Sequence, residues 1–230
     1  MFMTNEQLVK NLNFKEKVER SLQMIGEARE RYGKKLVVAN SLGKDSCVVW
    51  DLAKRVSADI RGFIVTTRFK PKETKMFMRD VVFRYPELTV YESHEEVDDG
   101  LHLSKPDECC RVLKVEPTRL ALEEHDAECW VTGLRCTEGE VRKDLREHQF
   151  LDFDLEKLNP ILCWTEREVW QYLALYHVPV NPLYREGYRS LGCAPCSAII
   201  TSGEKDERWG RWKNTPKIGG ECGIHTRPLK

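Results

Sequence analysis

The 230 residues amount to 26.9 kDa, enough for one domain with a substantial hydrophobic core. Hydrophobic residues make up 41% and charged residues 32%, a globular composition, and 37 basic side chains balance 37 acidic ones, which argues against a protein built to bind nucleic acid. No apolar run approaches the roughly 18 residues of a membrane span and the start lacks a signal-peptide pattern, so we expect a cytoplasmic protein without a membrane partner.

Helical and strand patterns alternate along the first two thirds of the sequence. Capping boxes at residues 4–7 and 13–16 predict two N-terminal helices within residues 1–35. Strands are predicted at residues 36–40, 60–65, 88–91 and 129–132, and helices at 47–53, 71–84 and 114–124. This alternation predicts the α/β fold class, with a doubly wound, mainly parallel sheet as a nucleotide-binding core over residues 36–158.

The C-terminal segment, residues 159–230, has a different texture. A capping box at residues 165–168 predicts one more helix, ending near Tyr176, and the chain after it is rich in proline and glycine turns. No low-complexity linker separates this segment from the core. We therefore expect it to belong to the same domain and to fold over the carboxyl edge of the sheet.

A turn between the first strand and its helix has the features of a phosphate-binding loop. In Ser41-Leu-Gly-Lys-Asp-Ser46, Gly43 can adopt a positive φ angle, Ser41 and Ser46 supply hydroxyl donors, and Lys44 adds a positive charge. The loop is not a Walker P-loop, because the Gly-x4-Gly-Lys-Ser/Thr spacing is absent. An ordinary capped turn is the alternative, but the position after the first strand favours a phosphate site.

Nine cysteines are many for a chain with no secretion signal, and their odd number does not suit a disulfide framework. Cys109-Cys110 and Cys193-Ala-Pro-Cys196 form two pairs whose four thiolates could bind an iron–sulfur cluster or zinc. Cys193 and Cys196 could instead form a redox disulfide, and unliganded core thiols remain an alternative for the first pair. Cys47, Cys129 and Cys163 have apolar neighbours and are interpreted as buried structural thiols, whereas Cys136 is ambiguous.

The segment Glu221-Cys222-Gly-Ile-His225 places a thiol beside a histidine near the C-terminus. Upstream, Arg208-Trp-Gly-Arg211-Trp212 can supply bidentate donors for phosphate or sulfate oxygens and can stabilise a thiolate. Cys222 is therefore a candidate nucleophile. An incidental cysteine beside a solvated basic stretch is the alternative.

Taken together, these motifs resemble the assimilatory adenylyl-sulfate (APS) and phosphoadenylyl-sulfate (PAPS) reductases, and in particular the cluster-bearing APS type. This family belongs to the adenine nucleotide α-hydrolase superfamily, whose Ser-Gly-Gly-Lys-Asp-Ser loop is similar to residues 41–46. Further matching stretches, in the order of the family, are Cys109-Cys-Arg-Val-Leu-Lys114, Trp130-Val-Thr-Gly-Leu-Arg135, Asn159-Pro160, Trp164-Thr165, Asn181-Pro-Leu-Tyr184, Gly187-Tyr-Arg-Ser-Leu-Gly-Cys-Ala-Pro-Cys196, Arg208-Trp-Gly-Arg-Trp212 and Glu221-Cys-Gly-Ile-His225.

The resemblance implies a role for each matching position. Cys222 would be the nucleophile, Lys114 would lie between cluster and substrate, and the nucleotide would bind at Ser41, Gly43, Lys44 and Ser46. The phosphosulfate would be held by Arg135, Arg142, Arg208, Arg211 and His225. A [4Fe–4S] cluster would be bound by Cys109, Cys110, Cys193 and Cys196.

Two departures from the family pattern stand out. The loop keeps the Lys44-Asp-Ser46 of ATP-using relatives where the reductases usually carry a degenerate loop. Arg135 is followed by Cys136 rather than by the usual second arginine, which bears on Arg142 and on the choice between APS and PAPS.

The reaction implied by the resemblance is sulfonyl transfer in assimilatory sulfate reduction. The Cys222 thiolate would attack the sulfur of the sulfonucleotide, forming S-sulfocysteine and releasing AMP (or its 3′-phosphorylated form). A thioredoxin-like or glutaredoxin-like dithiol carrier would then release sulfite. The alternatives are an ATP-dependent enzyme of the same fold, such as an RNA-thiolating enzyme or the small subunit of ATP sulfurylase, and a non-catalytic nucleotide-binding cluster protein. The sequence leaves open whether the chain forms a homo-oligomer.

Overall fold

The computed structural model describes residues 3–151, 155–200, 206–213, 215–217, 221 and 225. Six strands within these ranges form one sheet in the order β3-β2-β1-β4-β6-β5. All neighbouring strands are parallel except β5, which runs antiparallel to β6 at one edge. The strands are β1 (Leu36–Ala39), β2 (Arg61–Thr66), β3 (Leu88–Glu92), β4 (Cys129–Val131), β5 (His148–Phe150) and β6 (Glu156–Leu158).

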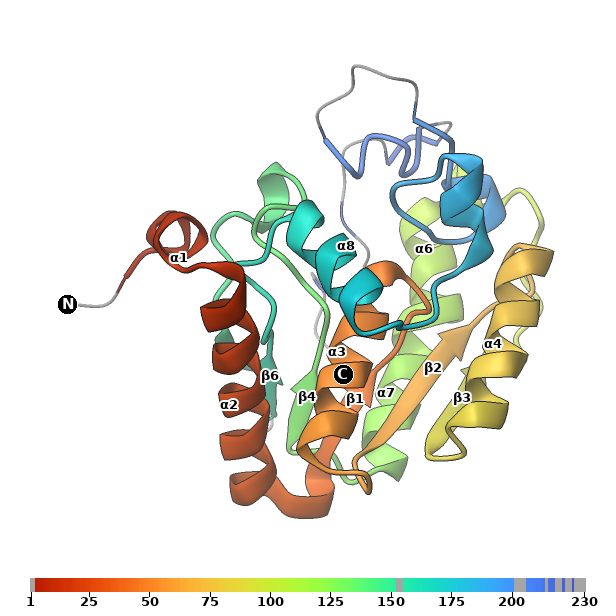
Figure 1. The fold of residues 1–230 in the computed structure, drawn as a ribbon. Helices are drawn as coiled ribbons and strands as arrows, with labels where there is room; N and C mark the ends of the chain where they lie inside the picture. Colours follow the sequence, from red (N-terminus) through yellow and green to blue (C-terminus); the bar gives the residue numbers. More distant parts are fainter. Residues whose placement is uncertain are drawn as a thin grey trace.

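Helices cover both faces of this sheet (Figure 1). Along β1, Leu36 and Val38 pack with α2, α3, α4 and α8, whereas Val37 points to the opposite face and packs with α7. The α-helices are α1 (Asn5–Asn11), α2 (Phe14–Tyr32), α3 (Lys44–Val56), α4 (Lys72–Arg84), α5 (Leu101–Ser104), α6 (Pro106–Cys110), α7 (Glu116–Glu124) and α8 (Glu166–Leu175). Single turns of other helix types are η1 (Gly33–Lys35), η3 (Glu140–Arg142), η5 (Pro182–Glu186) and η6 (Ala194–Cys196), and η2 (Arg111–Val115) is a π-helix. The predicted doubly wound α/β fold is thus confirmed.

All three predicted capping boxes are present. In each, a Thr or Asn side chain accepts from the backbone of the third helical residue, whose own Glu or Gln side chain returns to the cap. The predicted start of the first core helix was three residues too late, because α3 begins at Lys44 with Gly43 as its N-cap. Lys44 and Ser46 therefore belong to the first helical turn.

The sequence missed the two strands β5 and β6. They are three residues each, and in β6 the charged side chains of Glu156 and Lys157 are buried, so no apolar run marks the strand. The helix predicted to begin at Lys114 was also placed late. Helix α6 begins at Pro106 and continues through η2 into α7, which puts Cys109 and Cys110 within a helix.

The described part of the chain after α8 lies over the carboxyl ends of the parallel strands (Figure 1). It is tied together by an antiparallel bridge between Ser197 and Arg211. Among the described residues, no helix has the length and apolar character that crossing a membrane requires.

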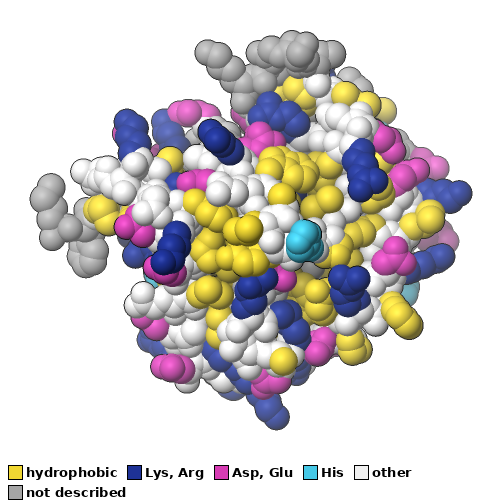
Figure 2. Space-filling model, in the orientation of Figure 1, with side chains coloured by type: hydrophobic (Ala, Val, Ile, Leu, Met, Phe, Trp, Pro, Cys, Tyr) yellow, Lys and Arg dark blue, Asp and Glu magenta, His cyan; other side chains and the backbone are white. Residues whose placement is uncertain are grey.

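One face of the molecule carries an apolar area at its centre. In the orientation of Figure 1, hydrophobic side chains gather in the middle of the visible face, with basic and acidic side chains around them (Figure 2). Leu175 at the end of α8 and Met76 in α4 are 58% and 55% exposed. The exposed surface of α8 and α4 therefore includes large hydrophobic side chains.

Candidate active site

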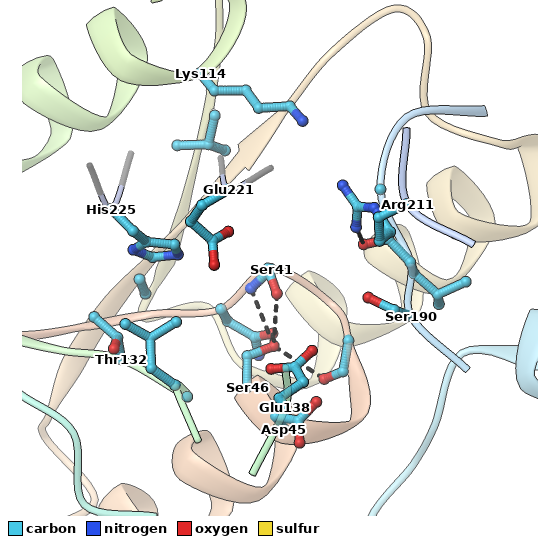
Figure 3. Close-up of a pocket in the computed structure, with 18 of the residues that line it drawn as sticks. Ser41, Asp45, Ser46, Lys114, Thr132, Glu138, Ser190, Arg211, Glu221 and His225 are labelled. Atoms are coloured by element: carbon cyan, nitrogen blue, oxygen red, sulfur yellow. Dashed lines mark hydrogen bonds between the residues drawn. The ribbon is translucent and has the colours of Figure 1, made fainter. Parts of the chain in front are cut away.

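A cavity opens at the carboxyl edge of the sheet, where the turns after β1 and β4 face the C-terminal segment. In Figure 3, Ser41 and Ser46 lie on one side of this cavity, Lys114 and Arg211 reach toward it from two others, and Glu221 and His225 lie between. Among the described residues, its charged lining side chains are five basic ones (Lys70, Lys114, Arg142, Arg208 and Arg211) and three acidic ones (Asp45, Glu138 and Glu221). The excess of positive charge suits an anionic ligand.

The loop after β1 is held by its own polar groups. Asn40 Oδ1 accepts from the Leu42 amide at 2.9 Å and from Ser46 Oγ at 3.1 Å, and Ser46 Oγ accepts from the Ser41 amide at 3.1 Å. The positive φ angle falls on Leu42 (66°) and not, as the sequence suggested, on Gly43 (−85°). The Asn40 side chain fixes the turn one residue earlier, and Leu42 becomes the strained position.

Two basic residues expected to bind substrate are instead buried in an ion-pair cluster. Lys44 Nζ lies 2.9 Å from Glu207 Oε2, and Arg135 donates to the same oxygen at 2.6 Å and to Asp45 Oδ1 at 2.6 Å. Although burial lowers the pKa of Lys44 and of Arg135, Asp45 and the other nearby acidic groups outweigh it and hold both pKa values above the usual range. Burial raises the pKa of Glu207 in spite of these two cations.

A second ion-pair cluster lines the cavity itself. Arg142 donates to Glu138 at 2.5 Å and to both carboxylate oxygens of Glu221, and Arg208 donates to Glu221 at 2.7 Å. Burial raises the pKa of Glu138, but Arg142 and Arg208 outweigh it and bring that pKa down to about 2. Two arginines and two carboxylates thus meet where an anionic ligand would bind.

His225 lies against the floor of the cavity. Its ring stacks on Trp130 with centroids 6.1 Å apart, and its Nδ1 is 3.4 Å from Lys157 Nζ. Burial, followed by the positive charges of Lys157 and Arg142, puts the pKa of His225 well below its usual range. Burial and Arg142 also lower the pKa of Lys157 to about 8. His225 is therefore neutral near pH 7 and can act as a hydrogen-bonding group.

The four cysteines of the two predicted pairs are buried, and the two pairs are neighbours. Burial raises the pKa of Cys109, and Cys193 and Cys196 add to this through their charges. Burial also opposes ionisation of Cys193, but Lys114, Lys70 and a 3.3 Å contact with Thr67 Oγ1 outweigh it and lower its pKa. Cys109 therefore interacts electrostatically with both cysteines of the second pair, and lysine charge lies beside Cys193. Among the described residues, no group of three or more His, Cys, Asp or Glu side chains has the arrangement of a single-ion site.

The structure brings most of the predicted site residues together. Ser41, Gly43, Ser46, Lys114, Arg142, Arg208, Arg211 and His225 line the cavity, whereas Lys44 and Arg135 lie behind its wall. The proposed nucleophile Cys222 falls outside the described residues, but Glu221 and His225, which flank it in sequence, are lining residues. The predicted structural thiols Cys47, Cys129 and Cys163 are buried as expected.

Sequence reasoning missed the acidic partners of these cations. Asp45, Glu138, Glu207 and Glu221 were not singled out, and neither were Lys157 and Tyr184. Glu221 belongs to the terminal motif and Asp45 to the loop after β1, so their places in these motifs could have marked them as site residues. Glu207 carried a weaker one, as the residue before Arg208.

The fold and this cavity define a doubly wound α/β protein with an arginine-lined cavity at the carboxyl edge of its sheet. A family model described as the phosphoadenosine phosphosulfate reductase domain matches residues 35–199, and the chain belongs to this family. It is 37% identical over 218 residues to the adenosine 5′-phosphosulfate reductase of Halalkalibacterium halodurans, covering 89% of this chain and 91% of that one. It is 33% identical to the phosphoadenosine 5′-phosphosulfate reductase of Gloeobacter violaceus, covering 88% and 87%. The solved phosphoadenylyl-sulfate reductase of Candida auris, a phosphate complex, has a similar fold, with a TM-score of 0.67 at 22% identity over 87% of this chain and 99% of that one.

Proposed function

We propose that this chain reduces a sulfonucleotide, adenylyl sulfate or its 3′-phosphorylated form, to sulfite. The observation that carries the proposal is the cavity lined by Arg142, Arg208 and Arg211 together with Glu221 and His225, which lie one residue before and three residues after Cys222 in the sequence. Relatives named as reductases of these two substrates cover nearly the whole chain. An arginine cluster at a cavity of net positive charge suits the phosphosulfate group that the two substrates share.

The reaction begins with attack of the Cys222 thiolate on the sulfur of the substrate. The new S–S bond forms as the bond between that sulfur and the bridging oxygen breaks, so AMP (or its 3′-phosphate) leaves with the electron pair and S-sulfocysteine remains. Negative charge grows on the leaving phosphate, where Lys114 and the arginines stabilise it. Because His225 is neutral, it serves as a hydrogen-bonding group to the sulfonyl oxygens.

The second half of the reaction needs two electrons from a dithiol. One thiolate of a thioredoxin-like or glutaredoxin-like carrier attacks the Cys222 sulfur and displaces sulfite. The second thiol of the carrier then closes a disulfide and restores the Cys222 thiol. Two carrier thiols are oxidised for each sulfite released, so electrons balance with no other reductant.

Cys109, Cys110, Cys193 and Cys196 would hold a [4Fe–4S] cluster beside Lys114. The electrostatic interaction of Cys109 with Cys193 and Cys196, and the lowered pKa of Cys193, support this set. When bound, the cluster would supply an electrostatic influence on Lys114 and the substrate, while the reducing electrons come from the carrier.

The test is anaerobic purification with iron and acid-labile sulfide assays, followed by sulfite release from adenylyl sulfate or its 3′-phosphorylated form with a thioredoxin system. We expect about four irons per chain and sulfite release that Cys222→Ser abolishes. Cys136→Ser is the matched control, because it removes a partly accessible thiol that does not line the cavity. A Cys222→Ser variant releasing sulfite at the wild-type rate would contradict the nucleophile. Turnover only with ATP and pyrophosphate release would contradict the reductase.

A further inference from the structure

The loop after β1 keeps the lysine of ATP-using relatives, yet the donors of that lysine are already engaged. The Lys44 ammonium has three hydrogens and three partners: Glu207 Oε2 at 2.9 Å, the Arg189 carbonyl at 3.0 Å and Asp45 Oδ2 at 3.3 Å. Its side chain is 0% exposed and does not line the cavity. A phosphate group entering the cavity would therefore find this lysine behind the wall.

The backbone of the same loop is closed as well. The Lys44 amide, in the first turn of α3, donates to Tyr184 Oη at 2.8 Å, so the tyrosine hydroxyl takes the place that an anion usually takes at a helix N-terminus. Gly133 packs on the same turn so tightly that a Cβ there would lie 2.9 Å from the Ser46 amide nitrogen. The Ser46 hydroxyl donates within the loop to Asn40 or Gly43.

Glu207 joins the two cations from outside the loop, and Asp45 joins them from within it. Glu207 Oε2 lies 2.9 Å from Lys44 Nζ and 2.6 Å from Arg135 Nη2, and the Glu207 side chain is 6% exposed. An oxygen contacted by two cations in this way is in the environment that a phosphoryl oxygen of a bound nucleotide would have. We propose that Glu207 is an internal anion which, with Tyr184 on the loop amide, closes this loop to phosphate and excludes nucleoside triphosphates as substrates.

The contrast with the second cluster supports this assignment. Arg142, Arg208 and Glu221 line the cavity, so an incoming anion can compete there with Glu221 for the arginines. Lys44 and Glu207 do not line it, so no ligand anion reaches them without displacing the buried carboxylate. The sulfonucleotide anion is then held at the arginine end alone. This inference rests on the proposed nucleotide site but not on the reductase reaction.

The experiment is calorimetric titration of the anaerobically purified full chain with inorganic pyrophosphate, with AMP as a parallel ligand that reports an intact site. Glu207→Gln keeps the side-chain shape and removes the charge, and Tyr184→Phe frees the Lys44 amide. Glu147→Gln is the matched control, a carboxylate paired with Arg20 at 2.6 Å that does not line the cavity. The double variant Glu207→Gln/Lys44→Met reports whether any gained affinity uses the loop lysine.

We expect Glu207→Gln to bind pyrophosphate at least about tenfold more tightly than the wild type, since one charge-assisted contact is worth this much. The double variant should lose the gain, Tyr184→Phe should show a smaller gain, and Glu147→Gln none. The proposal is overturned if Glu207→Gln binds AMP normally but gains no pyrophosphate affinity. It is equally overturned if Lys44→Met in the wild-type background weakens pyrophosphate binding tenfold. Should Glu207→Gln fail to fold, Tyr184→Phe and Lys44→Met decide. Sulfite release is measured separately, so failure of the reductase would leave these binding results intact.

Discussion

Glu138 offers the sharpest test of how the anion site is held together. Its side chain is buried, 2.5 Å from Arg142 and 3.7 Å from Arg208, and these arginines bring its pKa from the ordinary 4.5 down to about 2. We predict that Glu138→Gln, which keeps the shape but removes the charge, lowers the free energy of unfolding at pH 7. Among the described residues, the buried arginines would then have Glu221 as their remaining ion-pair partner.

The size of this effect follows from the pKa. A fall from 4.5 to about 2 corresponds to roughly 3 kcal/mol of stability carried by the ionised carboxylate. Since the pKa is depressed in the folded state, this stability is complete above pH 4.5 and is lost as the pH falls toward 2. The wild type and the Gln variant should therefore differ by roughly 3 kcal/mol at pH 7 and converge at acid pH.

The assay is urea unfolding followed by tryptophan fluorescence at several pH values between 7 and 3, on anaerobically prepared wild type and variant handled identically. Glu140→Gln is the control, because its partner Lys143 is 58% exposed and such surface pairs contribute little. A difference below about 1 kcal/mol at pH 7 would refute the assigned strength of the cluster. A full difference that persists at pH 3 would refute its electrostatic origin.

Two other positions give separate predictions. Lys157 has a pKa of about 8, and its Nζ lies 3.4 Å from Nδ1 of His225, so AMP affinity should fall as the pH rises through 8 and this lysine loses its charge. In calorimetric titrations at pH 7 and 9, Lys157→Met should bind AMP more weakly and show a smaller change with pH. An unchanged pH profile in this variant would contradict a contribution of the Lys157 charge to AMP binding. Gly133→Ala should lower thermal stability by an amount equivalent to about 1–3 kcal/mol, because its Cβ would meet Ser46 N at 2.9 Å and Asp45 C at 3.0 Å, which are backbone atoms that cannot turn aside. An unchanged melting temperature would show that the loop moves freely.

The sequence predicted those parts of the fold whose signals are local. A capping box such as Thr165 with Glu168 is complete within four residues, and the apolar run of β1 by itself predicts a buried strand. Strand β6 could not be found in this way. The buried Glu156 carboxylate accepts from the Tyr32 hydroxyl at 2.6 Å, and no local pattern predicts this partner 124 residues away.

In the candidate site, too, the sequence predicted some residues and missed others. Residue type and motif order predicted which cations and thiols gather at the carboxyl edge, since Lys114, Arg208 and Arg211 all line one cavity. They did not predict the carboxylates, because an acidic side chain in an anion site runs against simple charge complementarity. Buried arginines nevertheless need partners, and Glu138 and Glu221 supply them.

This need for partners changes what a basic residue in a motif can be taken to mean. Lys44 and Arg142 are both cations expected to bind the substrate, and both are paired with carboxylates. They differ in where the carboxylate lies. Glu221, the partner of Arg142, lines the cavity, where a ligand can compete with it, whereas Glu207, the partner of Lys44, is buried and does not line the cavity. A Lys-Asp-Ser loop therefore indicates phosphate binding only when its lysine is not already neutralised from within. In this chain Asp45 of the loop itself and Glu207, which comes from a segment about 160 residues further along, both pair with it.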